Sequence, residues 1–216
     1  FMSIIEKIVL FAFLSIGSLK ACSLWAVCAK SNTTLQELSA SGQEDLESQL
    51  ASFYQESSSM LHGWSLLCYS DYTQDSITPI YRSNIPATSD SILYWSAVNL
   101  LLGIESGRIG LGHLRYATSG VNSIPNPHPW MFYKDNNSFS LIHNGTVDKT
   151  LLYNLLTDND TDISWLESHS PQTFGGGDWR TIGWSNVVDS ELILLLIMKA
   201  ISLENDIFLG FQVAMN

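Results

Sequence analysis

The stretch LKACSLWAVCA (residues 19–29) sets a cysteine at the start of an apolar run. The residues that follow include tryptophan and valine, which favours a β-strand over Cys22–Ala29. Small Ala21 precedes Cys22, as it would at a signal-cleavage site. Cys22 is therefore either an ordinary residue of a core strand or, after cleavage, a new N-terminus with a free α-amine beside its thiol.

The segment ahead of this cysteine, residues 1–21, is typical of a signal peptide or a propeptide. Its apolar part, Ile8–Leu19, is too short to cross a bilayer, which needs about 20 residues. Two features are unusual for a signal peptide. Glu6 neutralises the charge of Lys7 before the apolar part, and Lys20 is a charged residue between the apolar part and the expected cleavage site. A buried N-terminal helix or strand is the alternative. A signal peptide would make the mature chain an exported bacterial protein, periplasmic or secreted; otherwise the chain would be cytoplasmic.

The gross composition is that of one globular domain. A chain of 216 residues, 45% hydrophobic and 11% aromatic, can bury one core and is short for two. Ten basic residues against 21 acidic ones give a net charge of −11, which opposes binding to nucleic acid or anionic lipid. The three cysteines are too few for a disulfide scaffold, and their spacing does not suggest zinc. We expect no nucleic-acid partner and no stable membrane insertion of the mature chain.

Hydrophobic periodicity predicts an α+β fold with helices covering sheets. The expected strands are Cys22–Ala29, Gly63–Ser70, Ile77–Ser83, Arg108–Thr118, a strand that ends at Asn144-Gly145, and the last nine residues, 208–216. The expected helices are Glu44–Glu56, 89–104, 147–157 and 189–204. Residues 119–130 and 168–186 are expected to be loops.

Two finer expectations concern helix caps and the other cysteines. Ser89 or Asp90 should cap one helix, and Asp189 or Ser190 should cap the last long one. Cys28 and Cys68 lie in strand-like runs, so both are expected to be small core residues.

Four short motifs follow the Cys22 strand: GHLRYATSG (112–120), NPHPW (126–130), IHNGTV (142–147) and DSE (189–191). Each alone has an ordinary explanation, such as a structural arginine, a hairpin turn or a helix cap. In this order they resemble the class II glutamine amidotransferases, which belong to the N-terminal-nucleophile hydrolases. The resemblance covers most of the chain from Cys22 to Gln212, and HLRYATSG and HNGTV are its most specific parts.

The resemblance implies a four-layer αββα sandwich of two mainly antiparallel sheets. It also implies that residues 1–21 are removed and that 22–216 form the amidotransferase domain, truncated at its C-terminus. Cys22 would be the nucleophile, with its own α-amine as general base. Asn144 and the backbone N–H of Gly145 would form the oxyanion hole.

The remaining motif residues would bind the amino-acid head of the substrate. The resemblance implies that Arg115, helped by Thr118, clamps the α-carboxylate, with His128 close to it. Asp189 would bind the α-ammonium group. The resemblance calls for no metal and no organic cofactor. Two features depart from the family pattern: Ser119 stands where many members have histidine, and a glycine-rich insertion, FGGGDW (174–179), precedes Asp189.

The chemistry of these residue types agrees with that assignment. A cysteine thiol has a pKa of about 8.5 and needs a base near neutral pH. A free α-amine, with a pKa of about 7.7–8.0, can accept that proton. An oxyanion donor supplied by an amide or a glycine N–H is worth roughly 3 kcal/mol in acyl transfer. A planar guanidinium and a carboxylate can read the two ends of an amino-acid head group.

The expected activity is hydrolysis of the γ-amide of glutamine, or of a γ-glutamyl compound, through a γ-glutamyl-thioester on Cys22. One alternative is a glutaminase subunit that delivers ammonia to a separate synthase chain. Another is a non-catalytic lipoprotein, because LKAC loosely resembles a bacterial lipobox and acylation would block both the thiol and the amine. The NGT sequon at Asn144 favours a bacterial route, since a glycan there would destroy the oxyanion hole.

Overall fold

The computed structural model describes residues 21–30, 32–69, 80–103, 106–117, 120, 122, 126–135, 137–172 and 182–216. Its strands are β1 (Ser23–Cys28), β2 (Trp64–Tyr69), β3 (Ile80–Ser83), β4 (Ile109–Leu114), β5 (Trp130–Lys134) and β6 (Asn137–Leu141). Its helices are α1 (Ala40–Glu56), α2 (Ser91–Leu102), α3 (Lys149–Thr157), α4 (Ser164–Ser168), α5 (Asp189–Glu204) and α6 (Ile207–Met215). Short 3₁₀ turns cover Ser57–Ser59, Ala87–Ser89 and Ile182–Ser185.

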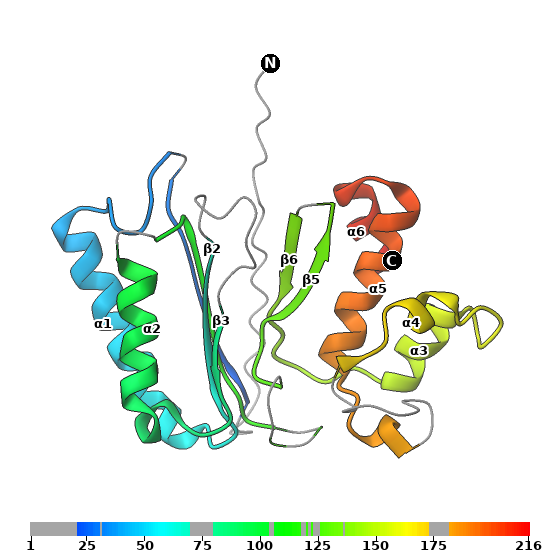
Figure 1. Cartoon of the computed structure of the whole chain (residues 1–216), viewed down its shortest axis with the longest axis horizontal. Coiled ribbons are helices and arrows are strands. Elements are labelled where there is room, and N and C mark those ends of the chain that lie inside the picture. Colours follow the sequence, from blue (N-terminus) through cyan, green and yellow to red (C-terminus); the bar gives the residue numbers. More distant parts are fainter. Residues whose placement is uncertain are drawn as a thin grey trace.

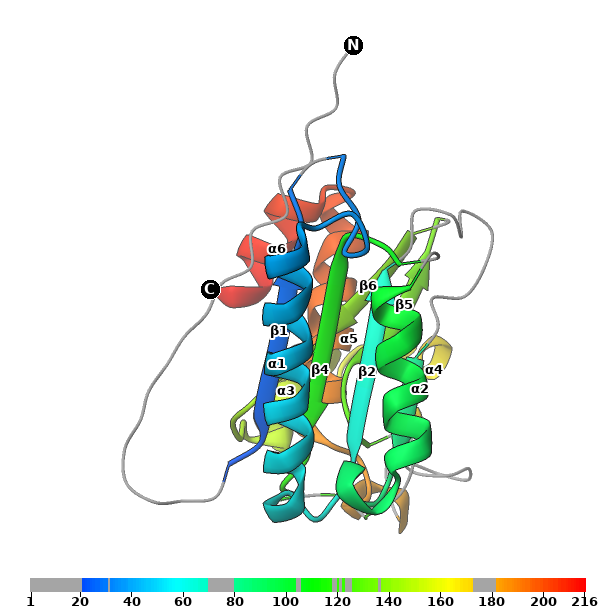
Figure 2. The ribbon, with the colours of Figure 1, turned by 90° about the vertical axis from the view of Figure 1, so that its left-hand side faces the viewer.

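Within the described residues the strands form two antiparallel sheets, which confirms the predicted α+β class. The larger sheet has the order β1-β4-β2-β3, and β5 and β6 form a separate hairpin. Helices α1 and α2 cover the outer face of the larger sheet (Figure 1, Figure 2). The hairpin lies on its other side, and α5 lies beyond the hairpin (Figure 1).

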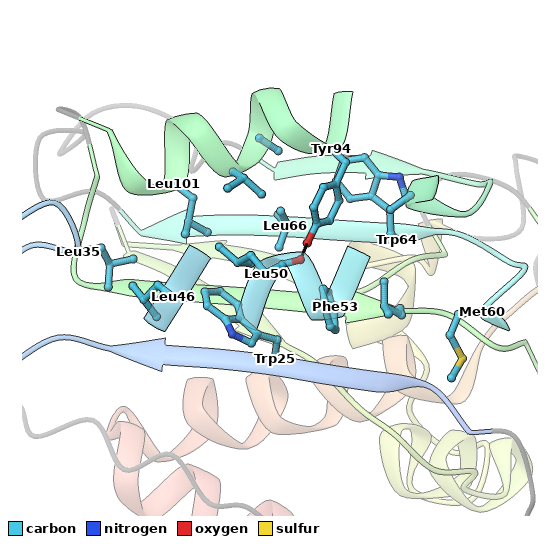
Figure 3. Close-up of a cluster of buried hydrophobic side chains, with 14 of the residues drawn as sticks. Trp25, Leu35, Leu46, Leu50, Phe53, Met60, Trp64, Leu66, Tyr94 and Leu101 are labelled. Carbon is cyan, nitrogen blue, oxygen red and sulfur yellow. Dashed lines mark hydrogen bonds between the residues drawn. The ribbon is translucent and has the colours of Figure 1, made fainter. Parts of the chain in front are cut away.

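The core under α1 and α2 depends on glycines in the central strand β4. A Cβ atom at Gly112 would lie 3.1 Å from both Leu66 and Phe53. The bare backbone therefore lets large side chains from α1 and β2 pack directly on the strand. Figure 3 shows this cluster, in which the buried Tyr94 hydroxyl donates a hydrogen bond to the carbonyl oxygen of Leu50 at 2.7 Å. That bond satisfies the one polar atom that Tyr94 brings into the core.

The opposite face of the larger sheet is polar where it meets the hairpin. Side chains alternate along a strand, so Gly110, Gly112 and Leu114 face the helices while His113 faces the hairpin. His113 and Ser65, on neighbouring strands, are both fully buried. A second apolar core joins the hairpin to α5, with Trp130 packed in the same cluster as Met198. The polar layer between these two cores contains the candidate site.

The C-terminal segment corrects one prediction. Residues 208–216 were expected to be a strand, but 208–215 lie in α6, which packs against α5, and Asn216 is its C-cap. The side chain of Asp206 caps this helix by accepting a hydrogen bond from the N–H of Leu209 at 2.8 Å. Gly210 faces α5 so closely that a Cβ atom would lie 2.4 Å from the Cα of Ile201. A cap and a helix-contact glycine thus outweigh the strand propensity of the apolar run.

Of the smaller expectations, the cap of α2 is confirmed in position only, and those for the cap of α5 and for Cys28 are wrong. Asp90 occupies the N-cap position of α2, as predicted, but its side chain makes no capping hydrogen bond. Val188 is the N-cap of α5, so Asp189 and Ser190 lie inside the helix. Cys28 is exposed at the end of β1, whereas Cys68 packs against the main core as expected. Strand β5 and helix α4 had no prediction, and residues 77–79 and 173–181 lie outside the described residues.

We predict that Gly210→Ala destabilises the protein by about 1–3 kcal/mol, because the added methyl group must push α6 away from α5. Urea denaturation should show the loss, and hydrogen exchange should increase in α6 first. Gly42→Ala is the matched control: it lies in α1, where the nearest atoms to a new Cβ are 3.4 Å away. It should be neutral or slightly stabilising. Equal effects at the two glycines would contradict the observed α5–α6 packing.

Candidate active site

Cys22 lies immediately before β1 and next to the end of β4. The two strands pair antiparallel, with Ser23 opposite Leu114, so the chain brings Cys22 to Arg115 and Tyr116. The N–H of Tyr116 donates to the Cys22 Sγ at 3.3 Å, and the Sγ lies 3.5 Å from the carbonyl oxygen of Tyr116. The sulfur therefore sits in a fixed backbone setting rather than in solvent.

A small cavity opens beside this sulfur. Of the residues predicted for the site, its lining includes Cys22, Arg115, His128, Gly145 and Asp189. These residues come from separate parts of the chain, and the fold brings them together. The free volume among the described lining residues is about 30 Å³.

Asn144 lies next to Cys22, and its side chain is hydrogen-bonded to the Cys22 backbone. Its Nδ2 donates a hydrogen bond to the Cys22 carbonyl oxygen at 2.7 Å, and its side chain is exposed. The amide nitrogen carries a second hydrogen, which is available to another acceptor. The Asn144 amide thus holds the backbone of Cys22 in place. Gly145, the next residue, lies over His143: a Cβ atom at Gly145 would be 2.9 Å from the Nε2 of that histidine.

Asp189 connects the start of α5 to the segment after Gly145. Its Oδ2 accepts a hydrogen bond from the N–H of Val147 at 2.8 Å, and its Oδ1 accepts one from the N–H of Ser190 at 2.9 Å. Asp189 is only 5% exposed and is the first residue of the helix, where the helix dipole favours a carboxylate. Asp189 therefore has a structural role, because it joins the first turn of α5 to the backbone at Val147.

The backbone around Arg115 is held by residues that sequence reasoning did not identify. The N–H of Arg115 donates to Gly63 at 2.8 Å, and its carbonyl accepts from the N–H of His62 at 3.1 Å. The ring of His62 accepts from the N–H of Ala117 through Nδ1 at 2.8 Å. His62 thus holds the backbone on both sides of Tyr116, the residue whose N–H contacts the Cys22 thiol. No motif in the sequence pointed to this histidine.

Burial controls the ionisation of the two groups nearest the cavity. Burial raises the pKa of the Cys22 thiol, an effect reduced by the Tyr116 backbone hydrogen bond and by the positive charge of Arg115. Burial lowers the pKa of Arg115, and the Cys22 thiolate partly opposes this shift. The thiol is therefore protonated at neutral pH and needs a base before it can attack a carbonyl group.

Three histidines form a column behind the cavity. The backbone N–H of His128 donates to the ring Nδ1 of His113 at 3.0 Å. The backbone N–H of His143 donates to the ring Nδ1 of His128 at 3.4 Å. The rings of His113 and His128 stack with centroids 4.2 Å apart. Each accepting nitrogen must be unprotonated, so His113 and His128 are neutral with the proton on Nε2.

The surroundings of the column favour the same neutral state. Burial lowers the pKa of His128 to about 3, helped by the charges of His143 and Arg115. Burial likewise places the pKa of His113 well below its ordinary value. The His113 Nε2 is buried at the cavity wall without a hydrogen-bond partner among the described residues. His113 and His143 both lie inside motifs recognised in the sequence, but neither was predicted as a site residue.

Some predictions fall outside this description. Thr118, Ser119 and the insertion 174–179 lie outside the described residues. In the described ranges, no group of three or more His, Cys, Asp or Glu side chains is arranged to hold a metal ion. None of the helices described is both long enough and apolar enough to cross a bilayer. The chain matches no protein-family model, and no curated protein sequence matches it significantly.

We predict that the histidine column makes the protein less stable in mild acid. In the unfolded chain His128 has a pKa of about 6.5, against about 3 when folded. As pH falls below 6.5, the unfolded chain binds a proton that the folded chain rejects. The free energy of unfolding therefore falls by up to about 1.4 kcal/mol per pH unit, and this loss ends near pH 3.

Urea denaturation between pH 8 and pH 4.5 checks this, with His128→Asn as the comparison. The Asn Oδ1 can accept the His143 N–H in place of Nδ1 but does not titrate. The variant should lose less stability over this range than the parent. His169→Asn, a change outside the column, should keep the parent's pH dependence. Parallel curves for the parent and His128→Asn would contradict the neutral state of His128.

Proposed function

We propose that this protein hydrolyses the γ-amide of glutamine, or of a γ-glutamyl compound, with Cys22 as the nucleophile. The single observation that carries the proposal is the cavity in which the Cys22 thiol meets Arg115, Gly145 and Asp189. These residue types can attack an amide, stabilise an oxyanion and bind both charged groups of an amino acid. The motif order that resembles class II glutamine amidotransferases supports the same function.

The proposed fold is the four-layer αββα sandwich of the N-terminal-nucleophile hydrolases. Helices α1 and α2, the larger sheet, the β5–β6 hairpin and α5 follow one another in that order (Figure 1), which supports this assignment. In this arrangement, the residues proposed for catalysis come from the strand ends and loops between the two sheets. The proposal includes residues 22–216 as the catalytic domain and residues 1–21 as a signal peptide or propeptide.

The proposed reaction has two steps. The α-amine of a liberated Cys22 takes the thiol proton, and the thiolate attacks the γ-carbonyl carbon of the substrate. The resulting oxyanion is stabilised by Asn144 and the N–H of Gly145, and ammonia leaves with the returned proton. Water then hydrolyses the thioester, which gives glutamate and restores the thiol. The raised pKa of the buried thiol makes a nearby base essential.

Substrate selection in this proposal depends on the amino-acid head group. The guanidinium of Arg115 binds the α-carboxylate with the help proposed for His128 and Thr118, and Asp189 binds the α-ammonium. The Oδ2 of Asp189 accepts one backbone hydrogen bond and retains lone pairs for the substrate. Ammonia is released in this proposal unless a separate synthase subunit accepts it.

The enclosed sulfur argues for the enzyme over the lipoprotein. A lipid-modified cysteine must hold its sulfur outward so that the acyl chains reach a bilayer. The Cys22 Sγ instead faces the cavity and contacts the backbone of Tyr116.

We predict that the protein releases ammonia and glutamate from glutamine only when Cys22 is the N-terminal residue. The test uses the full chain with a specific protease site placed immediately before Cys22 and cut after folding. The cut protein should be active, and the uncut chain should not be. Cys22→Ser should abolish the activity, while Cys28→Ser, at the exposed end of the same strand, should retain it. An inactive cut protein with a verified free cysteine would refute the proposal.

We also predict that Arg115→Lys raises the KM for glutamine by about tenfold or more, which corresponds to a loss of at least ~1.4 kcal/mol in binding. Lysine keeps the positive charge but loses the planar pair of donors that fits a carboxylate. The kcat should change less, because head-group binding is present in both the ground state and the transition state. Arg108→Lys, just before β4, is the matched control and should leave KM unchanged. A change in kcat alone would assign Arg115 a different role.

A further inference from the structure

We propose that His143 is a positioning residue that holds the Asn144–Gly145 corner in the orientation needed for catalysis at Cys22. This inference rests on the proposed function and deepens it. His143 directly precedes the corner, lines the same cavity as Cys22, and is tied to both sides of the site. Neither its ring nor its backbone has a part in the proposed chemical steps.

The backbone of His143 is anchored to the larger sheet through the other two histidines. Its N–H donates to the Nδ1 of His128, whose own N–H donates to the Nδ1 of His113 on β4. His113 is fully buried and His128 is 7% exposed, so this column cannot swing into solvent without opening the interior. The start of the corner is therefore fixed relative to β4, the strand that also leads to Arg115.

The side chain of His143 is anchored to the start of α5. Its Nδ1 lies 3.0 Å from the Oγ of Ser190, which is 4% exposed. The Ser190 Oγ in turn lies 3.4 Å from the Oδ1 of Asp189, the residue whose other oxygen accepts from the N–H of Val147. The chain is thus tied to the first two residues of α5 at positions 143 and 147, which stand on either side of the corner.

The imidazole ring of His143 also packs against Gly145, the second residue of the corner. A Cβ atom at Gly145 would lie 2.9 Å from the His143 Nε2, so the ring fills the space directly beneath that glycine. Removing the ring, or its bond to Ser190, lets the Gly145 N–H turn away. A displaced oxyanion donor weakens transition-state stabilisation without affecting the thiol or the head-group contacts.

The test compares His143→Gln and Ser190→Ala in the full chain that is cut before Cys22 after folding. Both should lower kcat for glutamine by about tenfold or more, since loss of one oxyanion donor typically costs about 10²–10³ in kcat. For His143→Gln, KM and the rate at which iodoacetamide alkylates Cys22 should stay within about twofold of the parent, because the head-group residues and thiol access are unchanged. For Ser190→Ala only the alkylation rate serves as this control, because the Ser190 Oγ also contacts Asp189, the proposed ammonium binder. Ser190→Thr retains the hydroxyl and should restore most of the activity. His169→Gln, a histidine that packs on Trp165 outside the cavity, should match the parent.

The possible outcomes are distinguishable. A selective fall in kcat supports the positioning role. An unchanged kcat overturns it, and so does a fall that is matched by slower alkylation and a lower Tm, because that pattern indicates general loss of structure. If the cut parent protein itself neither hydrolyses glutamine nor reacts with glutamine-like electrophiles, the proposed function fails and this inference fails with it.

Discussion

The site depends on the antiparallel pairing of β1 with β4. This pairing joins the start of the described chain to a strand almost a hundred residues later, and Cys22 contacts Tyr116 at a separation of 94 positions. The register matters for the thiol, because a slip of one residue would turn the side chains of β1, and Cys22 with them, to the opposite face of the sheet. Gly110 of β4 supports this register, since a Cβ atom there would lie 3.0 Å from Trp25 and 3.1 Å from Val27, both in β1.

The second constraint is the polar layer between the two sheets. Buried imidazoles, an arginine and a serine are costly to remove from water, and the protein limits that cost by keeping the histidines neutral. Each accepting ring nitrogen is matched to a backbone N–H, so His113 and His128 are fixed in one tautomer. The neutral histidines therefore add no further charge to a layer that already holds Arg115 and Asp189.

The start of α5 completes the site from the other side. Asp189 and Ser190 are buried there, and their side chains reach the segment that contains Asn144 and Gly145. The loop that would stabilise the oxyanion is thus attached to two independent bodies: the larger sheet through the histidine column and α5 through Asp189 and Ser190. A rigid attachment to both explains how exposed loop residues can keep a defined orientation beside Cys22.

Most local elements could be predicted from the order and spacing of residues along the chain. The strands at Cys22, Gly63 and Arg108 and most helices followed from periodicity, because each of these segments buries one face. The C-terminal helix α6 was mistaken for a strand, since its contact with α5 through Gly210 has no local signal.

Only the tertiary structure revealed the positions of His62, His113 and His143, because their partners lie far away in the chain. It alone also showed the double use of Asp189 as a helix residue and a loop anchor, and the exposure of Cys28. Sequence patterns record which side chains are present and which face they bury. Long-range pairing decides which of them meet, and that depends on register and close packing that no short segment contains.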